Sequence, residues 1–198
     1  AIYGAVQPDS GEIYIRGERV HIGSPSQATR HGIGYICDER IRSGLFPLLD
    51  ISSNIAAGNL DTAKRLCFVS PGKIKQLGRS FIQRLGIKVY NAEAPIDYLS
   101  GGNQQKVVIG KCVNMYSSLV IMDEPTSGLD VASKGDFYNI INEFVRNGTG
   151  ILFISSNVSE LLGMCDRILV MNKGRLVEQF YHNSVSAEKL LDSIATES

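Results

Sequence analysis

Short apolar runs alternate with a helical pattern in the second half of the chain. One mostly apolar run lies at 118–122 and another at 151–154. Runs of this length are typical of strands that are buried on both faces, as in a parallel sheet. Between them, 137–145 repeats apolar residues at helical spacing. A strand, a helix and a strand in this order predict a right-handed parallel crossover and therefore an α/β fold.

Alternating patterns predict antiparallel hairpins near both ends of the chain. Residues 12–15 and 19–22 flank one turn, and 168–171 and 176–178 flank another. A strand is also predicted at 33–36, and a short amphipathic helix at 186–194. A longer helix is expected from Pro71 to Gly86, because its apolar residues share one face. Those residues are Ile74, Leu77, Phe81, Ile82 and Leu85.

A serine and two glycines stand directly before a run of helix-forming residues. Ser100, Gly101 and Gly102 precede the segment 103–109. Ser100 can cap the helix, and the glycines let backbone N–H groups approach a ligand because no Cβ is in the way. Free N–H groups and the positive end of the helix dipole favour an anion, most often phosphate. From these residues alone, an ordinary core helix with a Ser-Gly-Gly cap is an equal alternative.

The apolar run at 118–122 leads directly into Asp123 and Glu124. Open α/β sheets bind ligands at the carboxyl ends of their strands. Asp123 is suited to hold Mg²⁺, which prefers one or two carboxylates together with water and phosphate oxygens. Glu124 is suited to orient or deprotonate an attacking water. The alternative is a pair of solvated carboxylates at a strand end.

Three motifs in this order resemble those of ABC-transporter ATP-binding subunits. LSGGNQQ at 99–105 resembles the signature loop, the strand into Asp123-Glu124 the Walker B strand, and SGLD at 127–130 the D-loop. The longer patterns LSGGNQQKV, ISS and LGMCDRILVM are similar to the second ATP-binding half of the tandem ATPases that energise sugar importers. This resemblance implies a P-loop NTPase-like fold: a mostly parallel sheet with helices on both faces, antiparallel β-hairpins at the edge and a helical subdomain.

The resemblance also implies roles for single residues. Asp123 would hold Mg²⁺, and Glu124 would be catalytic. The residues implied to bind ATP are Ser100, Gly101, Gly102, Asn103, Gln104 and Asp130. In the family, two halves meet head to tail, so this signature loop would serve an ATP that the partner half holds.

Two positions depart from the family pattern. Asp38 stands where most members have a glutamine that contacts the metal and the attacking water, and Ser156 where they have a histidine that clamps the γ-phosphate. An acidic residue at 38 resembles the second halves of sugar-importer ATPases. Serine can donate one hydrogen bond, but it lacks the charge and reach of imidazole. We therefore expect an intact signature loop beside a weakened nucleotide site, with Asp38 and Ser156 at altered catalytic positions.

The glycine-rich Walker A loop of the family is missing from the sequence, which contains no GxxxxGK[ST] pattern. In the family this loop would lie just before Ala1, so we expect the chain to be truncated there. The Walker A lysine and loop amides supply most phosphate contacts in such enzymes. We therefore expect this chain by itself to be inactive.

Length and composition narrow the possibilities further. The 198 residues fit one truncated nucleotide-binding domain, with a β-rich core part at 1–48, a helical subdomain at 49–99 and the signature helix, Walker B, D-loop and C-terminal part at 100–198. Acidic and basic residues number 20 each, which argues against a general nucleic-acid binder. The four scattered cysteines form no CxxC pair and fit a reducing cytosol. No apolar run is long enough to span a membrane.

The resemblance thus implies an ATPase that uses ATP and Mg²⁺ to energise import of a sugar or related small solute. Its partners would be a second ABC ATP-binding half, in tandem or as a homodimer, polytopic permease subunits and, indirectly, a solute-binding protein. Its location would be cytoplasmic, peripheral on the inner face of the cell membrane. Two alternatives stay open: a non-catalytic or regulatory half that serves dimerisation and docking, and a non-transport ABC ATPase acting on DNA or ribosomes.

Overall fold

A computed structural model describes residues 1–37, 44–182 and 184–195 of the chain. It divides into two compact units, 1–152 and 153–198, and each is described here by itself. None of the helices in the described ranges is both long and apolar enough to cross a bilayer. The organisation as a single domain with three parts stays a prediction.

A parallel sheet lies at the centre of the first unit. Its strands are β3 (Ile33–Ile36), β6 (Leu119–Asp123) and β7 (Gly150–Ile154), in the order β3-β6-β7. β3 and β6 pair from Ile33 opposite Leu119 to Ile36 opposite Met122. The middle of β6 is buried, with Met122 at 0% exposure. The prediction of a buried parallel strand is confirmed for the run at 118–122. The run at 151–154 also forms a strand, but none of its residues is buried, so the predicted burial is wrong there, where β7 stands last in the strand order.

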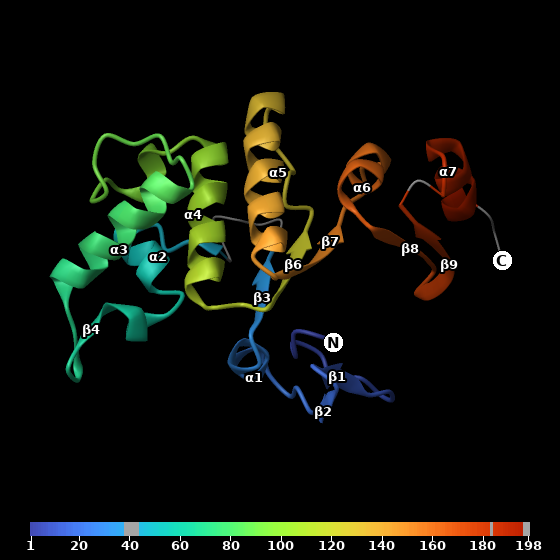
Figure 1. Cartoon of the computed structure of the whole chain (residues 1–198), viewed down its shortest axis with the longest axis horizontal. Coiled ribbons are helices and arrows are strands. Elements are labelled where there is room, and N and C mark those ends of the chain that lie inside the picture. The colour runs from blue at the N-terminus through green and yellow to red at the C-terminus, as the bar shows by residue number, and fades with distance from the viewer. Residues whose placement is uncertain (38–43, 183, 196–198) are drawn as a thin grey trace. The chain divides into compact units, whose positions relative to one another are not determined.

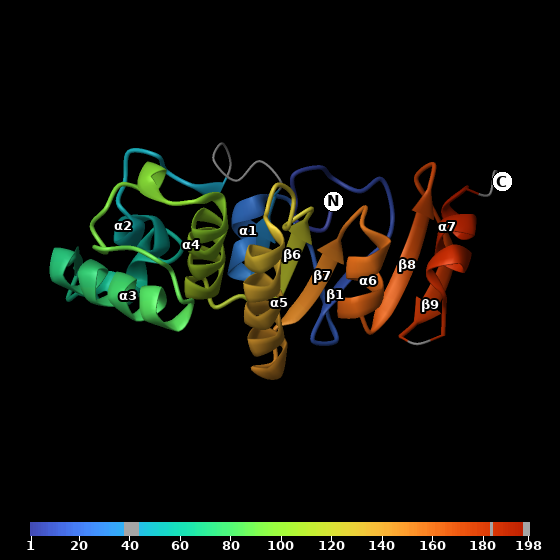
Figure 2. The ribbon, with the colours of Figure 1, turned by 90° about the horizontal axis from the view of Figure 1, so that it is seen from above.

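Three helices accompany this sheet. They are α1 (Pro25–Arg30), α4 (Gly101–Asn114) and α5 (Val131–Arg146). Figures 1 and 2 show α4 and α5 side by side, with α5 next to β6. The apolar face of α5 is buried through residues at helical spacing, namely Phe137, Ile140, Ile141 and Phe144. The helix predicted at 137–145 is therefore confirmed and begins earlier than expected, at an aspartate cap described below.

A small hairpin covers the amino-terminal side of the sheet. Strands β1 (Ile13–Ile15) and β2 (Glu18–Val20) pair antiparallel, and both turn residues, Arg16 and Gly17, have positive φ. This is the geometry of a two-residue hairpin turn, which matches the twist of the strands. Apolar side chains of the hairpin pack against a buried cluster of Ile22, Ala28, Ile33 and Ile121. The predicted hairpin is confirmed, with shorter strands than the pattern suggested.

Residues 49–99 are mostly helical. They contain α2 (Ile51–Ala56), the 3₁₀ helix η2 (Leu60–Ala63), β4 (Lys64–Arg65), β5 (Phe68–Val69), α3 (Pro71–Arg84) and the 3₁₀ helix η3 (Ile96–Tyr98). Asp50 caps α2 through a 2.6 Å bond from the Ser53 N–H. The wholly buried Asn54 amide donates to the carbonyls of Phe46, Leu49 and Asp50. This single side chain closes the loop before α2, because it satisfies carbonyls that would otherwise be buried without partners.

The second unit is a hairpin with two helices. It comprises α6 (Val158–Met164), β8 (Arg167–Asn172), β9 (Arg175–Tyr181) and α7 (Ala187–Ala195). Ile168, Val170, Phe180 and Leu190 form its buried cluster. The predicted second hairpin and terminal helix are confirmed. α7 packs through Leu190, which is fully buried.

Candidate functional site

The amino terminus of α4 lies at the surface with its first-turn amides uncapped. Ser100 occupies the N-cap position with extended backbone, and Ser100 and Gly101 are exposed. The Ser100 hydroxyl takes no backbone N–H of the first turn. Instead, Asn103 Nδ2 donates to Ser100 Oγ at 3.0 Å. Ser100 is thus the N-cap residue, as expected, but its side chain makes no capping bond, and its hydroxyl accepts from Asn103 instead. The first-turn N–H groups, which have no partner within a helix, remain available to an anion.

Asn103 and Gln104 are both tied to neighbouring loops. Asn103 Oδ1 accepts the N–H of Lys88 at 2.9 Å, so this one side chain joins the helix start to the segment that follows α3. Gln104 Nε2 donates to the carbonyl of Ile96 at 3.4 Å. These bonds fix the direction of the helix start. Their roles in binding ATP, like that of Gly101, stay predictions.

Gly102 lies where α4 approaches the start of α5. A Cβ at this position would stand 2.5 Å from Ser133 Oγ and 3.0 Å from Ser133 Cβ, so only glycine fits without a shift. Ser133 is itself held by Asp130, which accepts its N–H at 2.8 Å and its hydroxyl at 3.0 Å. These bonds, the backbone one first, lower the pKa of Asp130. Asp130 is thus the ionised N-cap of α5, and Ser133 connects it to the Ser-Gly-Gly turn.

Asp123 ends β6 at the carboxyl edge of the parallel sheet. Tyr35, on the neighbouring strand β3, donates its hydroxyl to Asp123 Oδ2 at 3.0 Å. The Tyr35 ring stacks on Tyr3 with centroids 5.2 Å apart. Desolvation first, then the bond to Asp123 and its charge, raise the pKa of Tyr35 to about 12. The phenol therefore stays protonated at neutral pH, and its hydrogen bond fixes one oxygen of Asp123. No motif in the sequence pointed to Tyr35, whose partner lies 88 residues further along the chain.

Glu124 sits in a strained turn directly after β6. Its φ is +44°, a conformation that a residue with a Cβ adopts at a cost of about 1 kcal/mol. The Glu124 carbonyl accepts the N–H of Ser127 at 3.1 Å, which starts the turn that leads to Gly128 and Asp130. Asp123 and Glu124 thus leave the same strand end, as the sequence predicted. Their catalytic and metal-binding roles stay predictions.

The two altered positions are described only in part. Asp38 lies outside the described residues. Ser156 belongs to the second unit, where it is exposed in the turn between β7 and α6. Next to it, Ser155 donates to Glu160 at 3.0 Å and accepts the N–H of Asn157 at 3.0 Å. This turn is ordered by its own short-range hydrogen bonds.

Lys106 is a buried cation in the same helix and was not singled out from the sequence. Its side chain is 9% exposed, and Nζ contacts Asp136 Oδ2 at 2.9 Å and the Gly86 carbonyl at 3.1 Å. It therefore joins α4 to α5 and to the turn that follows α3. Hydrogen bonding to Lys106, and then its charge, lower the pKa of Asp136. The position of Lys106 within its helix could not predict a partner 30 residues further along the chain.

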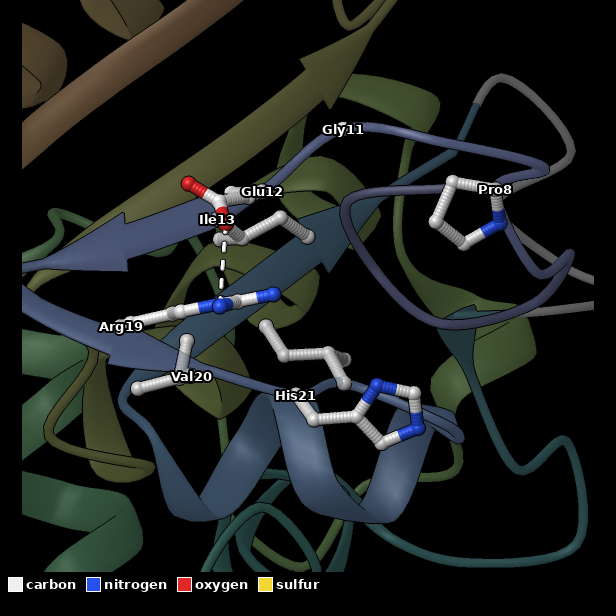
Figure 3. Close-up of a pocket in the computed structure, with 8 residues that line it drawn as sticks. Pro8, Gly11, Glu12, Ile13, Arg19, Val20 and His21 are labelled. Atoms are coloured by element: carbon white, nitrogen blue, oxygen red, sulfur yellow. Dashed lines mark ion pairs between the residues drawn. The ribbon is translucent and has the colours of Figure 1, made fainter.

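A separate cavity of about 350 Å³ lies beside the first hairpin (Figure 3). It is lined by Pro8, Gly11, Glu12, Ile13, Arg19, Val20, His21 and Ile22. Arg19 and Glu12 form a 3.0 Å ion pair across it. None of the residues predicted to bind nucleotide lies in this lining. We therefore assign the candidate site to the α4 start and the β6 end.

Within the described residues, no three His, Cys, Asp or Glu side chains form a metal-binding cluster. Mg²⁺ needs less, because it is commonly bound by one or two carboxylates together with water and substrate phosphates. Asp123, fixed by Tyr35 at a strand end, fits that requirement. The uncapped amides at the α4 start fit a polyphosphate.

Comparisons with known proteins place these features in context. A family model described as "ABC transporter" matches residues 1–127. The ribose import ATP-binding protein RbsA of Pseudomonas putida is 37% identical over 196 residues, covering 99% of this chain and 38% of that protein. The xylose import ATP-binding protein XylG of Thermoanaerobacter pseudethanolicus is 38% identical over 192 residues, covering 96% and 38%. The chain thus spans less than two fifths of the length of these relatives.

Solved structures resemble the chain in fold. CbiO1 of Clostridium perfringens, described as part of the ABC transporter complex cbiONQ, aligns with a TM-score of 0.77 at 23% identity, covering 96% of this chain and 73% of that one. The bacterial ABC transporter cassette MJ0796, in a dimeric structure, aligns with a TM-score of 0.74 at 18% identity, covering 92% and 78%. Likeness at this identity concerns the fold, and it confirms the predicted α/β architecture.

Proposed function

Because the chain belongs to the ABC transporter family, we propose that it is part of an ATPase that energises import of a sugar or related small solute. The observation that carries this proposal is the exposed start of α4. Its first-turn amides are left uncapped, and the side chains around it are fixed by bonds to one another. Such a helix start favours a phosphate through its N–H groups and its dipole.

In this proposal the phosphates are gripped from two sides. Ser100, Gly101 and Gly102 face an ATP held by a second ABC half, with Asn103 and Gln104 fixing their direction. Asp130 and Ser133 support the same turn from α5. Asp123 holds Mg²⁺ at a different nucleotide, with Tyr35 orienting one of its oxygens. The metal would neutralise phosphate charge, and Glu124 would orient the attacking water.

We further propose that the two nucleotide sites are unequal. This half contributes an intact signature loop to one site, while its own site has Asp38 and Ser156 at the altered positions. Neither residue can replace the glutamine or histidine in both charge and reach. The resemblance to the second half of tandem sugar-import ATPases supports this proposal. A non-catalytic half that serves dimerisation and docking is the alternative, and the same two residues favour it.

The proposed class of solute, a sugar, follows from the names of the relatives. Their names refer to import of ribose and of xylose, and they support a sugar as the cargo of this protein. The partners in this proposal are a second ATP-binding half, permease subunits in the membrane and, indirectly, a solute-binding protein. The location is the inner face of the cell membrane. Nucleic acid has no part in it.

An ATPase assay on the full-length protein tests the proposal. Ser100→Arg places a bulky side chain at the phosphate-facing turn and should abolish most turnover. Glu124→Gln, which alters the weaker site, should reduce turnover much less. Ser80→Arg is the matched control, because Ser80 is an exposed serine on α3 whose hydroxyl bonds only the Leu77 carbonyl in the described structure.

The outcomes of that assay distinguish the proposal from its alternatives. Equal losses in Ser100→Arg and Glu124→Gln would contradict unequal sites. Full activity in Ser100→Arg would contradict the role of the α4 start. An unsubstituted full-length protein without turnover would favour the non-catalytic alternative. The present chain, which lacks a Walker A pattern, should bind Mg-ATP very weakly in calorimetry, and micromolar affinity would refute that expectation.

A further inference from the structure

One segment of the chain is strongly basic although the whole chain is neutral. Between Asp61 and Glu93 there are seven lysines and arginines and no aspartate or glutamate, whereas the full sequence has 20 residues of each sign. This segment contains the β4–β5 hairpin, which is β4, the turn residues Leu66 and Cys67, and β5. The nucleotide chemistry proposed above uses no residue of this hairpin.

The β4–β5 hairpin exposes large apolar side chains. Leu66 is 93% exposed and Phe68 is 80% exposed, while Val69 is 40% exposed. Lys64 pairs with Val69 and Arg65 with Phe68. Figure 1 shows β4 in a loop that projects past the beginning of α3, away from α4 and α5. Side chains that lie on a projection and pack against no hydrophobic core contribute little to the stability of the fold.

Leu66 is an unfavourable choice for this turn on conformational grounds. Its φ is +57°, in the left-handed region where glycine or asparagine costs less. A leucine there carries backbone strain, and its side chain gains no compensating burial within the chain. The residue therefore fits a contact made outside this chain better than a role in the fold.

Cations surround this apolar turn. Lys64 and Arg65 precede it, and Lys73 lies beside it, where Lys73 Nζ donates to the Lys64 carbonyl. Lys64 pairs with Asp61, and Arg65 makes no ion pair with any described residue. Further along α3, Lys75 pairs with Glu93 at 3.0 Å. The hairpin thus presents apolar side chains at its turn and net positive charge around them.

We propose that the β4–β5 hairpin contacts an anionic lipid bilayer. Apolar side chains inserted at the level of the headgroups, with lysines and arginines beside them, are the usual means by which a surface segment binds such a membrane. A protein interface is the less suitable partner, because a specific one needs about 800 Å² on each side and a packed centre. Two side chains on a convex projection do not supply that. This proposal goes beyond ATP hydrolysis and does not depend on nucleotide.

Vesicle binding by the 198-residue chain, without nucleotide, tests it. Vesicles of phosphatidylcholine with about a third phosphatidylglycerol should bind the chain, pure phosphatidylcholine should bind it far less, and added salt should release it. The double variant L66S/F68S should weaken partitioning by at least about tenfold, because both apolar contacts are lost. Arg65→Ser should weaken it by roughly fivefold, the value of one charge near such a surface.

Tyr116→Ser is the matched control. Tyr116 is 76% exposed and also has a positive φ of 53°, but it lies in the turn after α4 rather than in the basic segment. Its replacement should leave vesicle binding unchanged. Because all these side chains are exposed, the variants should keep the unfolding midpoint of the parent, which separates lost binding from lost folding.

A second measurement reports the location of the turn directly. The chain has no tryptophan, so Phe68→Trp provides a single fluorophore at the hairpin. Its emission should shift to shorter wavelength on anionic vesicles, while Tyr116→Trp should not shift. Equal shifts at both positions, no binding to anionic vesicles, or binding that survives L66S/F68S would overturn the proposal. So would a protein partner captured through the hairpin by a chain that ignores vesicles.

Discussion

The close contact between α2 and α3 predicts that a single added methyl group has a large effect on stability. Gly78 lies in the middle of α3 and is buried against Ser52 of α2. A Cβ at Gly78 would stand 2.5 Å from Ser52 Cβ and 2.7 Å from Ser52 Cα. Ser52 cannot turn away, because its N–H and its hydroxyl both bond the Ala92 carbonyl, at 3.3 Å and 3.1 Å. The backbones of α2 and α3 must therefore separate.

Two opposing effects set the change in the free energy of unfolding that Gly78→Ala causes. Carbon atoms pack at about 3.5–4.0 Å, so Gly78→Ala requires the helices to move apart by about 1 Å. Overpacking of this kind costs about 1–3 kcal/mol, and a forced backbone shift belongs at the upper end of that range. Alanine returns up to about 1 kcal/mol through its better helix propensity. We expect Gly78→Ala to lower the free energy of unfolding by about 2 kcal/mol.

Gly135→Ala is the matched control, because Gly135 also lies inside a helix of the first unit. Nothing stands within 4 Å of a Cβ at that position, so only helix propensity changes. Gly135→Ala should raise the free energy of unfolding by about 0.5–1 kcal/mol. Urea unfolding followed by circular dichroism measures both variants. Two variants with the same shift in midpoint would refute the reasoning, because the propensity effect is common to both and only the contact with Ser52 differs.

Three further predictions concern single side chains. Lys106→Met should lower the free energy of unfolding by about 1–3 kcal/mol, because the charged hydrogen bonds from Lys106 to the Gly86 carbonyl and to Asp136 are both lost. Asp136→Asn should cost much less in urea unfolding. Since the pKa of Asp136 is lowered, the effect of Asp136→Asn should be present above about pH 4 and disappear as the pH falls through that pKa. In the full-length protein, Tyr35→Phe should weaken Mn²⁺ binding severalfold, measured by electron paramagnetic resonance, with little change in the unfolding midpoint. Iodoacetamide followed by peptide mass mapping should label the exposed Cys67 in the native chain and label Cys112 only after denaturation, because burial raises the pKa of Cys112 to about 12.

The central sheet could be predicted from the sequence because burial on both faces leaves a simple trace. β6 is a run of apolar residues that ends at Asp123, and no competing pattern interrupts it. The β4–β5 hairpin could not be predicted in the same way. Its strands have two residues each, which is too short for an alternating pattern. Its turn also has Leu66 where turn chemistry favours glycine or asparagine.

The candidate site also has parts that the sequence could predict and parts that it could not. The motifs located the α4 start and the β6 end, because both depend on residues adjacent in sequence. The contacts that hold them depend on residues far apart: Tyr35 and Asp123 are 88 positions apart, and Lys106 and Asp136 are 30 apart. Side-chain preference also failed at Ser100, where a neighbouring amide competes successfully for the hydroxyl. Long-range partners and local competition are both outcomes of the packed structure.

The start of α4 lacks the side-chain capping bond that stabilises many helices. A serine at the N-cap that bonds a first-turn amide stabilises a protein by about 1 kcal/mol. Here Asn103 occupies the Ser100 hydroxyl, and the same asparagine also holds the Lys88 N–H. Because the side chains satisfy one another, the backbone amides are left for an outside acceptor while the loop stays fixed. Gly102 and Ser133 then limit any movement of the turn towards α5. The first-turn amides therefore stay available to an anion, as the proposed binding of a partner's nucleotide requires.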